Sequence, residues 1–388
     1  MKNNIPQGYK ATALGIIPQE WEVMLLGNLS NSISSGRNKH RDANGQYPVF
    51  GSTGIIGYSS TYEYEGPVIL VARVEANAGT LNFASGQYDV SDNTLIITIK
   101  QNVYDYNFAY NQLTHYKLNK LVFGSGQPLI TSKQLKNIRI PVPPLAEQQK
   151  IAEVLGVWDE AIEKQARLIE KLALRKRALM QRLLSAKLRL PGFSEPWKTL
   201  HIADFAFEIN SRNKSNSPYE VLSCTKYEGL VSSLKYFGKQ IYSDDLSTYK
   251  IVPKNRFAYA TNHIEEGSIG YQSKYDQALI SPMYTVFGTN PSLINDAFLY
   301  KLLKTQKLIY LYKSRMEGSI DRRGGLRWND FASIKIALPS IEEQTAIAEV
   351  LTAADREIEL AKEKLERLRR QKRGLMQQLL TGKKRVKY

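Results

Sequence analysis

The feature that most constrains this chain is an internal repeat. Residues 143–187 recur at 339–383, shifted by a constant 196 positions without a gap, with 21 identities in 45. Repetition at a fixed spacing is the signature of duplicated structural units, so the molecule is a tandem duplication. The segments before the two copies barely resemble each other. We therefore expect the like parts to bind something twice, and the unlike parts to bind different things.

Both copies carry the pattern of a long coiled-coil helix. Apolar residues recur with alternating spacings of four and three, without an internal proline. The seam positions are Ile151, Leu155, Trp158, Ile162, Gln165, Ile169, Leu172, Lys176, Leu179 and Leu183 in the first copy, and Ile347, Leu351, Ala354, Ile358, Ala361, Leu365, Leu368, Lys372, Leu375 and Leu379 in the second. Prolines precede both copies, and Ser340 with Glu343 forms a capping box. Two amphipathic helices that pack separately on their own domains remain the alternative.

The lysines in the seam favour an antiparallel pair. A parallel, in-register arrangement would put Lys176 against Lys372, whereas antiparallel pairing sets Lys372 beside Trp158 and Lys176 beside Ala354. A lysine stem can lie on an indole ring, while two facing ammonium groups repel each other.

The remainder of each half predicts a compact domain of mixed short strands and helices. Apolar runs such as PVILVARV and MYTVF lie between glycine and asparagine turns, and a helix is expected around 294–313. Sequences around Trp21 and Trp197 match, so the duplication covers the whole chain. We predict an α+β architecture: a domain in 1–142, a helix in 143–187, a second domain in 188–338, and a helix with a basic tail in 339–388.

The charge of the chain indicates a polyanionic partner. Its formal net charge is +16, which favours nucleic acid or an anionic membrane, although a basic protein without such a partner remains open. No window approaches the span of a membrane helix, and nothing resembles a signal peptide, so we expect a cytoplasmic protein. The single cysteine, Cys224, excludes an internal disulfide.

Loops of both domains supply candidate DNA contacts, because arginine, lysine and amide side chains bind phosphates and base edges. In the first domain the candidates are Arg37, Lys39, Arg41, Arg73 and Asn77; in the second they are Arg212, Lys214, Asn262, His263, Arg322, Arg323 and Arg327.

No catalytic motif is evident. The GxxxxGK[ST] phosphate loop is absent, and the glycine-rich FGSG at 123–126 is not followed by the Asn-Pro-Pro-aromatic tetrad of adenine methylases. The four histidines have no metal-ligand spacing, so we predict no catalytic residue and no metal ligand.

The motif PxPPLxEQxxIAxxL running into a long heptad helix, present twice and each time after a divergent domain, resembles the specificity subunit of Type I restriction-modification enzymes. The resemblance covers the whole chain. It implies two target recognition domains of α/β character, each reading half of a split DNA site, and an antiparallel helical spacer with pseudo-two-fold symmetry. It departs at Glu75, where similar proteins often carry glycine.

The resemblance also implies partners. These are double-stranded DNA, two modification (methyltransferase) subunits docked on the helices, and restriction subunits that act as ATP-dependent translocase and endonuclease. We assign the contact with the modification subunits to Glu147, Gln148, Glu343 and Gln344. This chain would bind no cofactor, and S-adenosylmethionine would lie on the modification subunits.

Two other classes remain as alternatives. One is the DNA-recognition part of a Type IIG/IIB-like restriction enzyme, which would need catalytic motifs that this chain lacks. The other is a coiled-coil scaffold that does not bind DNA, which salt-sensitive binding to duplex DNA would exclude.

Overall fold

The computed structural model describes residues 5–122, 129–317 and 325–388. They form two compact units, one of residues 1–167 with 362–388 and the other of residues 168–361. Each unit thus contains one β-rich domain, half of one long helix and half of the other. The expected α+β class and the two long helices are confirmed.

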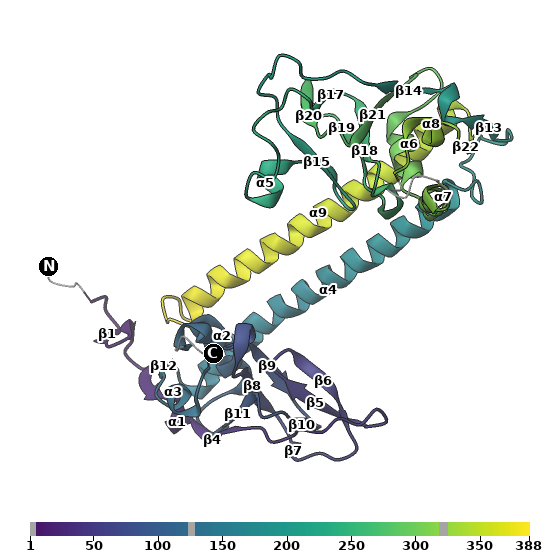
Figure 1. The fold of residues 1–388 in the computed structure, drawn as a ribbon. Coiled ribbons are helices and arrows are strands. Elements are labelled where there is room, and N and C mark those ends of the chain that lie inside the picture. The colour runs from purple at the N-terminus through teal and green to yellow at the C-terminus, as the bar shows by residue number, and fades with distance from the viewer. Residues whose placement is uncertain (1–4, 123–128, 318–324) are drawn as a thin grey trace. The chain divides into compact units, whose positions relative to one another are not determined.

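The first unit is built around two four-stranded sheets, in the orders β4-β11-β8-β9 and β6-β5-β10-β7 (Figure 1). Its elements are β1 (Tyr9–Thr12), β2 (Gly15–Pro18), β3 (Glu22–Leu25), α1 (Leu26–Leu29), β4 (Ser30–Ser35), β5 (Tyr47–Gly51), β6 (Gly54–Ser59), β7 (Tyr64–Glu65), β8 (Val68–Ala72), β9 (Leu81–Ala84), β10 (Gln87–Val90), β11 (Thr94–Ile99), α2 (Tyr106–Tyr116), α3 (Ser132–Lys136) and β12 (Arg139–Val142). The core joins Trp21 and the sheet residues Ile69 and Ile97 to the long helices through Leu155 and Leu379.

The second unit repeats the four-stranded sheet in the order β14-β21-β18-β19. Its elements are β13 (Lys198–His201), β14 (Ala206–Ile209), β15 (Leu222–Thr225), β16 (Gly229–Ser232), α5 (Ser233–Phe237), β17 (Lys250–Pro253), β18 (Arg256–Ala260), β19 (Ile269–Gln272), β20 (Gln277–Ile280), β21 (Tyr284–Thr289), α6 (Asp296–Leu303), α7 (Gln306–Glu317), α8 (Trp328–Ala332) and β22 (Lys335–Leu338). In both units the strand before the long helix pairs antiparallel with the strand after the tryptophan segment: β12 with β3, and β22 with β13.

The helix expected around 294–313 is in fact two helices, α6 and α7. The break lies at Lys304 and Thr305, where the Thr305 hydroxyl donates to the carbonyl of Leu302 at 2.8 Å. The Thr305 carbonyl then accepts the first hydrogen bond of the next helix, from Ile309 at 2.9 Å. A threonine that bonds to neighbouring backbone groups in this way favours a helix boundary over a helix interior.

The long helices α4 (Leu145–Leu183) and α9 (Ile341–Leu379) pair antiparallel within each unit. In the first unit Lys372 Nζ lies 2.5 Å from Asp159 Oδ1, and in the second Lys176 pairs with Asp355. The orientation is therefore as predicted, but the lysine partners are different. Each lysine pairs with the aspartate that follows the predicted neighbour, Trp158 or Ala354. The two ion pairs are equivalent under the shift of 196 positions.

The distribution of charge along the helices explains the direction. In α9, residues 341–361 carry six acidic and one basic side chains, and residues 362–379 carry two acidic and seven basic ones. In α4, residues 145–167 carry five acidic and three basic side chains, and residues 168–183 carry one and five. Antiparallel pairing sets an acidic half against a basic half in each unit, whereas a parallel pair would align like charges.

Candidate nucleic-acid interface

In the first domain the candidate cations Arg37, Lys39 and Arg41 lie exposed on the loop that follows β4. Backbone amides of Arg37 and Asn38 donate to the carbonyl of Val90 at 3.0 and 2.9 Å. The Asn38 side chain donates to Asp89, and its Oδ1 accepts from the His40 amide at 3.0 Å and from Arg41 at 2.6 Å. The loop is therefore held by the asparagine, and Arg41 is already engaged within it.

Arg73 and Asn77 lie half-buried beside the same loop. The Arg73 guanidinium donates to Ser35 Oγ at 3.3 Å, at the end of β4, while its Nε is buried without a hydrogen-bond partner. The Asn77 carbonyl accepts the Thr80 amide at 2.9 Å. The structure thus brings Arg73 to the base of the Arg37 loop, and both residues contribute to the shape of that loop.

In the second domain Arg212 and Lys214 lie exposed on the loop after β14, the strand equivalent to β4. Arg212 forms an isolated β-bridge with Lys250, which is 9% exposed. Burial lowers the pKa of Lys250, Glu208 opposes this, and Arg212 lowers it further. Lys250 was not among the sequence candidates, because only the fold brings this strand to the loop.

A second group of candidates meets at the end of β18. Asn262 is half-buried and His263 is exposed, and the Leu326 amide donates to the carbonyl of the adjacent Thr261 at 2.9 Å. Arg327 is exposed beside this contact, whereas Arg322 and Arg323 lie outside the described residues, as does the FGSG stretch at 123–126. The fold thus brings 261–263 next to 325–327, although these segments are more than sixty positions apart.

Two of the histidines have acidic neighbours that the sequence analysis missed. His263 Nδ1 lies 3.6 Å from Glu266 Oε1, and His201 Nδ1 lies 3.7 Å from Asp204 Oδ2. Glu265 joins His263 and Glu266 in the one group of possible metal ligands found among the described residues, with ligand atoms within 4.8 Å of one another. Both pairs are three residues apart, so spacing within one turn was the signal available in the sequence.

The four residues assigned to the modification subunits are buried inside this chain. Glu147, Gln148, Glu343 and Gln344 are 0%, 0%, 2% and 1% exposed. The buried carboxylates each hold an arginine from beyond the end of the opposite helix, and the amides fasten helix α2 or α6 to the start of the long helix. This burial argues against direct contact between these four side chains and another subunit.

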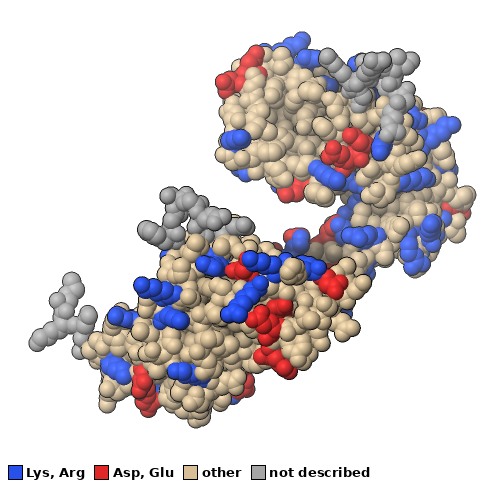
Figure 2. Space-filling view, turned by 60° about the horizontal axis from the view of Figure 1, so that its bottom comes forward, with Lys and Arg blue, Asp and Glu red and all other residues tan. Residues whose placement is uncertain are grey.

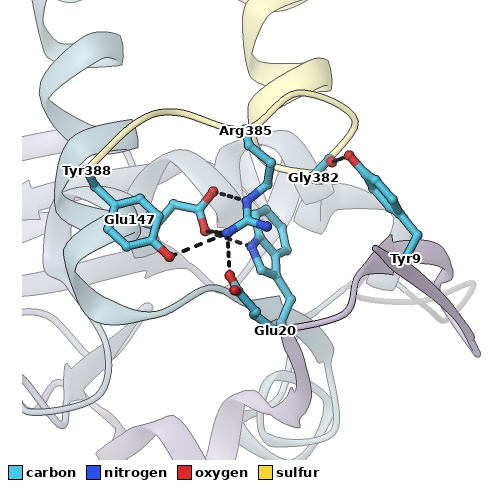
Figure 3. Close-up of polar contacts among 7 residues, drawn as sticks. Tyr9, Glu20, Glu147, Gly382, Arg385 and Tyr388 are labelled. Carbon is cyan, nitrogen blue, oxygen red and sulfur yellow. Dashed lines mark hydrogen bonds and ion pairs between the residues drawn. The ribbon is translucent and has the colours of Figure 1, made fainter. Parts of the chain in front are cut away.

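The Glu147 site illustrates how the carboxylate is used (Figure 3). Glu147 Oε2 accepts from Trp21 Nε1 at 2.9 Å, and Arg385 Nε lies 2.5 Å from Glu147 Oε1. Arg385 also reaches Glu20 at 2.7 Å, and the Tyr9 hydroxyl donates to the carbonyl of Gly382 at 3.0 Å. Residues after α9 are therefore part of the first unit.

The equivalent site in the second unit uses Glu343. Arg189 Nε and NH2 lie 2.7 and 2.8 Å from Glu343 Oε1 and Oε2. Both arginine–glutamate pairs are related by the shift of 196 positions. The tryptophan differs, since the buried Nε1 of Trp197 has no hydrogen-bond partner.

The two glutamines make equivalent contacts. Gln148 accepts from the Asp105 amide at 2.9 Å and donates to the carbonyls of Val103 and Pro143, both at 2.9 Å. Gln344 accepts from the Asn295 amide at 2.9 Å and donates to the carbonyls of Leu293 and Pro339 at 3.0 and 3.1 Å. Asp105 and Asn295 are the N-caps of α2 and α6. The repeated Glu-Gln pair is therefore a structural joint between domain and helix.

A hollow of about 480 Å³ in the second domain adds a surface that the sequence did not reveal. It is lined by residues of β15, β16, α5, β19 and the following turn, among them Lys235, Tyr236, Tyr271, Lys274 and Tyr275. On the face shown in Figure 2, lysine and arginine side chains are spread over both units, and acidic ones form fewer and smaller groups. Among the described residues no helix is long and apolar enough to cross a membrane.

Comparison with known proteins agrees with this geometry. The family described as Type I restriction modification DNA specificity domain matches residues 18–173 and again 195–370. Two similar proteins of Methanocaldococcus jannaschii are the putative type I restriction enzyme MjaX specificity subunit and the MjaVIII specificity subunit. Each is 25% identical, the first over 98% of this chain and 97% of its own length, the second over 96% and 94%.

Solved structures of the same fold include the Type I restriction-modification S subunit from M. genitalium. It is 18% identical, with a TM-score of 0.58, and the match covers 98% of this chain and 97% of that one. A chain from a structure describing assembly and conformational transition of the type I restriction-modification system has a TM-score of 0.55 at 17% identity, covering 94% and 99%.

Proposed function

Because this chain belongs to the family of Type I restriction-modification DNA specificity subunits, we propose that each of its two recognition domains reads one half of a bipartite, asymmetric DNA site. The observation that carries this is the contrast between like and unlike parts. The joints Glu147–Arg385 and Glu343–Arg189 repeat across the duplication, whereas the loops of the two domains differ. Alike joints hold the domains in the same way, and unlike loops suit unlike half-sites.

The paired helices set the distance between the half-sites in this proposal. Half-sites read from one face of the duplex lie about one helical turn, roughly 34 Å, or a multiple of it, apart. A helix rises about 1.5 Å per residue, so each long helix of 39 residues extends over about 58 Å. This length is sufficient to act as a ruler of that size.

We further propose that two modification subunits dock on exposed helix surface, that restriction subunits join them, and that S-adenosylmethionine is bound by the modification subunits. The names of the relatives as specificity subunits of restriction enzymes support this. Docking on the exposed helix surface replaces the assignment to the buried Glu-Gln pairs. A chromosomal DNA target would place the activity in the cytoplasm.

Methylation mapping tests the proposal. Cells that express the chain with a modification subunit should acquire one bipartite methylated motif, and the purified chain alone should neither methylate nor cleave DNA. Replacing residues 1–142 by the matching domain of a relative should change one half-site only. Inserting four residues near Ala173, about 6 Å of helix, should change the spacer by one or two base pairs. A changed half-site with an unchanged spacer after the insertion would contradict the role of the helices.

A further inference from the structure

The two recognition domains share a short basic element. The tripeptide Arg-Asn-Lys occurs at 37–39 and again at 212–214, 16 positions after Trp21 and 15 after Trp197. In each domain it follows the edge strand of the equivalent four-stranded sheet, β4 or β14. The element is therefore repeated in sequence and in place, within domains that otherwise differ.

The central asparagine of each element is used inside the protein. Asn213 is 1% exposed, its Nδ2 donates to the carbonyl of Ser217 at 2.9 Å, and its Oδ1 accepts from the Ser217 amide at 3.0 Å. Asn38 is similarly bonded to Asp89 and to the loop backbone at His40. An asparagine that reads adenine needs both amide groups free. These two asparagines instead anchor the loop.

The flanking cations face solvent without a neutralising partner. Side chains alternate in extended backbone, so an inward asparagine puts the residues before and after it on the outer side. Arg37 and Lys39, and likewise Arg212 and Lys214, are exposed, and among the described residues no ion pair engages any of the four. In the second domain Lys250 lies next to Arg212 and adds positive charge.

We propose that the two Arg-Asn-Lys elements bind the phosphate backbone of DNA and place each domain on its half-site without reading bases. This rests on the proposed function and resolves what these loops contribute to it. Two domains that read different sequences need different base-reading side chains, whereas the phosphodiester backbone is the same at every half-site. In extended backbone, cations two residues apart are separated by about 6.6 Å along the chain, and one DNA strand advances about 3.4 Å per nucleotide. Each element can therefore span neighbouring phosphates of one strand.

The test compares charge removal in the two elements with a matched control in the full-length chain. The variants are R37A/K39A, R212A/K214A, and the control K198A/K335A, which removes two exposed lysines from the β13–β22 pair. Binding to the methylated-motif duplex and to a random-sequence duplex is measured from 50 to 200 mM salt. Each lost phosphate contact should lower the log-log salt slope by about 0.9, so that the fourfold salt increase costs about 3.5-fold less affinity per contact.

The expected result is that both element variants weaken the two duplexes by the same factor, with slopes reduced by up to about 1.8, while the control leaves the slope unchanged. The conservative variant R37K/R212K should retain most of the affinity, since lysine binds phosphate but cannot make the paired contact of arginine to guanine. Methylated half-sites should stay the same in every variant.

Two results would overturn the proposal while leaving the proposed function intact: a changed base in either half-site, or a loss confined to the cognate duplex. An unchanged slope in both element variants would also overturn it. If the unaltered chain shows no salt-sensitive binding to duplex DNA, the proposed function fails, and the inference fails with it.

Discussion

Removing Arg385 tests whether the segment after α9 holds the first unit together. Glu147 is 0% exposed, and its two carboxylate oxygens depend on Arg385 and on Trp21 Nε1. Breaking a buried ion pair by deleting one partner costs about 3–5 kcal/mol. The Arg385 side chain is 31% exposed, so water can reach part of the vacated site. We therefore expect Arg385→Ala to lower the free energy of unfolding of the first unit by about 2–3 kcal/mol.

The assay must separate the two units, because a chain with two units need not unfold in one step. For a unit of this size the expected loss corresponds to a fall in melting temperature of about 4–12 °C. Hydrogen exchange on peptides of residues 5–122 should show the loss of protection, and peptides of residues 190–317 should not. Arg189→Ala should give the reverse pattern, because Glu343 holds that arginine in the second unit.

Two further variants decide whether the reason is the stranded charge. Adding Glu147→Gln to Arg385→Ala removes that charge and should restore more than half of the lost stability. Arg167→Ala breaks an exposed pair with Glu163 and should cost less than about 0.5 kcal/mol. If Arg385→Ala were as harmless as Arg167→Ala, or if Glu147→Gln restored nothing, the reasoning would be refuted.

Two other predictions concern pH and backbone strain. Burial alone would raise the pKa of Asp355, but hydrogen bonds from Lys176 and Lys301 outweigh it and the pKa is lowered; the carboxylate therefore stabilises the second unit above about pH 4, and the benefit disappears as the pH falls through the lowered value. Urea unfolding at pH 5 and pH 3 should accordingly show a smaller acid-induced loss for Asp355→Asn than for the unaltered chain, and equal losses would contradict this. Gly79 has φ of +92°, and an added Cβ would lie 2.4 Å from the Asn119 nitrogen, so Gly79→Ala should destabilise the first unit by more than about 3 kcal/mol. The matched variant Gly86→Ala, with φ of +83° and open space, should cost only about 1 kcal/mol, and similar values for both would rule out the clash.

Local patterns in the sequence predicted the long helices and their direction. Heptad spacing, the prolines before Leu145 and Ile341, and the positions of Lys176 and Lys372 are all visible within a few turns of helix. The partners of those lysines were missed because an aspartate outside the seam reaches them. The break at Thr305 was missed because the apolar pattern continues across it.

The role of the Glu-Gln motif could not be read from local pattern. A motif repeated at a helix start suggests a shared binding surface, but burial is decided by residues far away in sequence, such as Arg385, 238 positions from Glu147. One signal was available, since Arg189 and Arg385 are themselves 196 positions apart, just beyond the aligned repeat. In the domain interiors, contacts such as Arg212 with Lys250 depend on strand pairing that short alternating runs do not specify.

The first unit is assembled from two segments separated by the whole second unit, and this has a consequence for biosynthesis. Residues 362–388 leave the ribosome after residues 168–361, and they supply Met376, Leu379 and Leu380 to the core of the first unit. At about 5–20 residues per second, the early domain waits roughly 10–40 seconds for the last 194 residues of this sequence. The second unit is continuous in sequence and can complete its fold sooner. The usual order, in which the amino-terminal domain matures first, is therefore reversed, and during that interval the first domain exposes the apolar surface that α9 later covers.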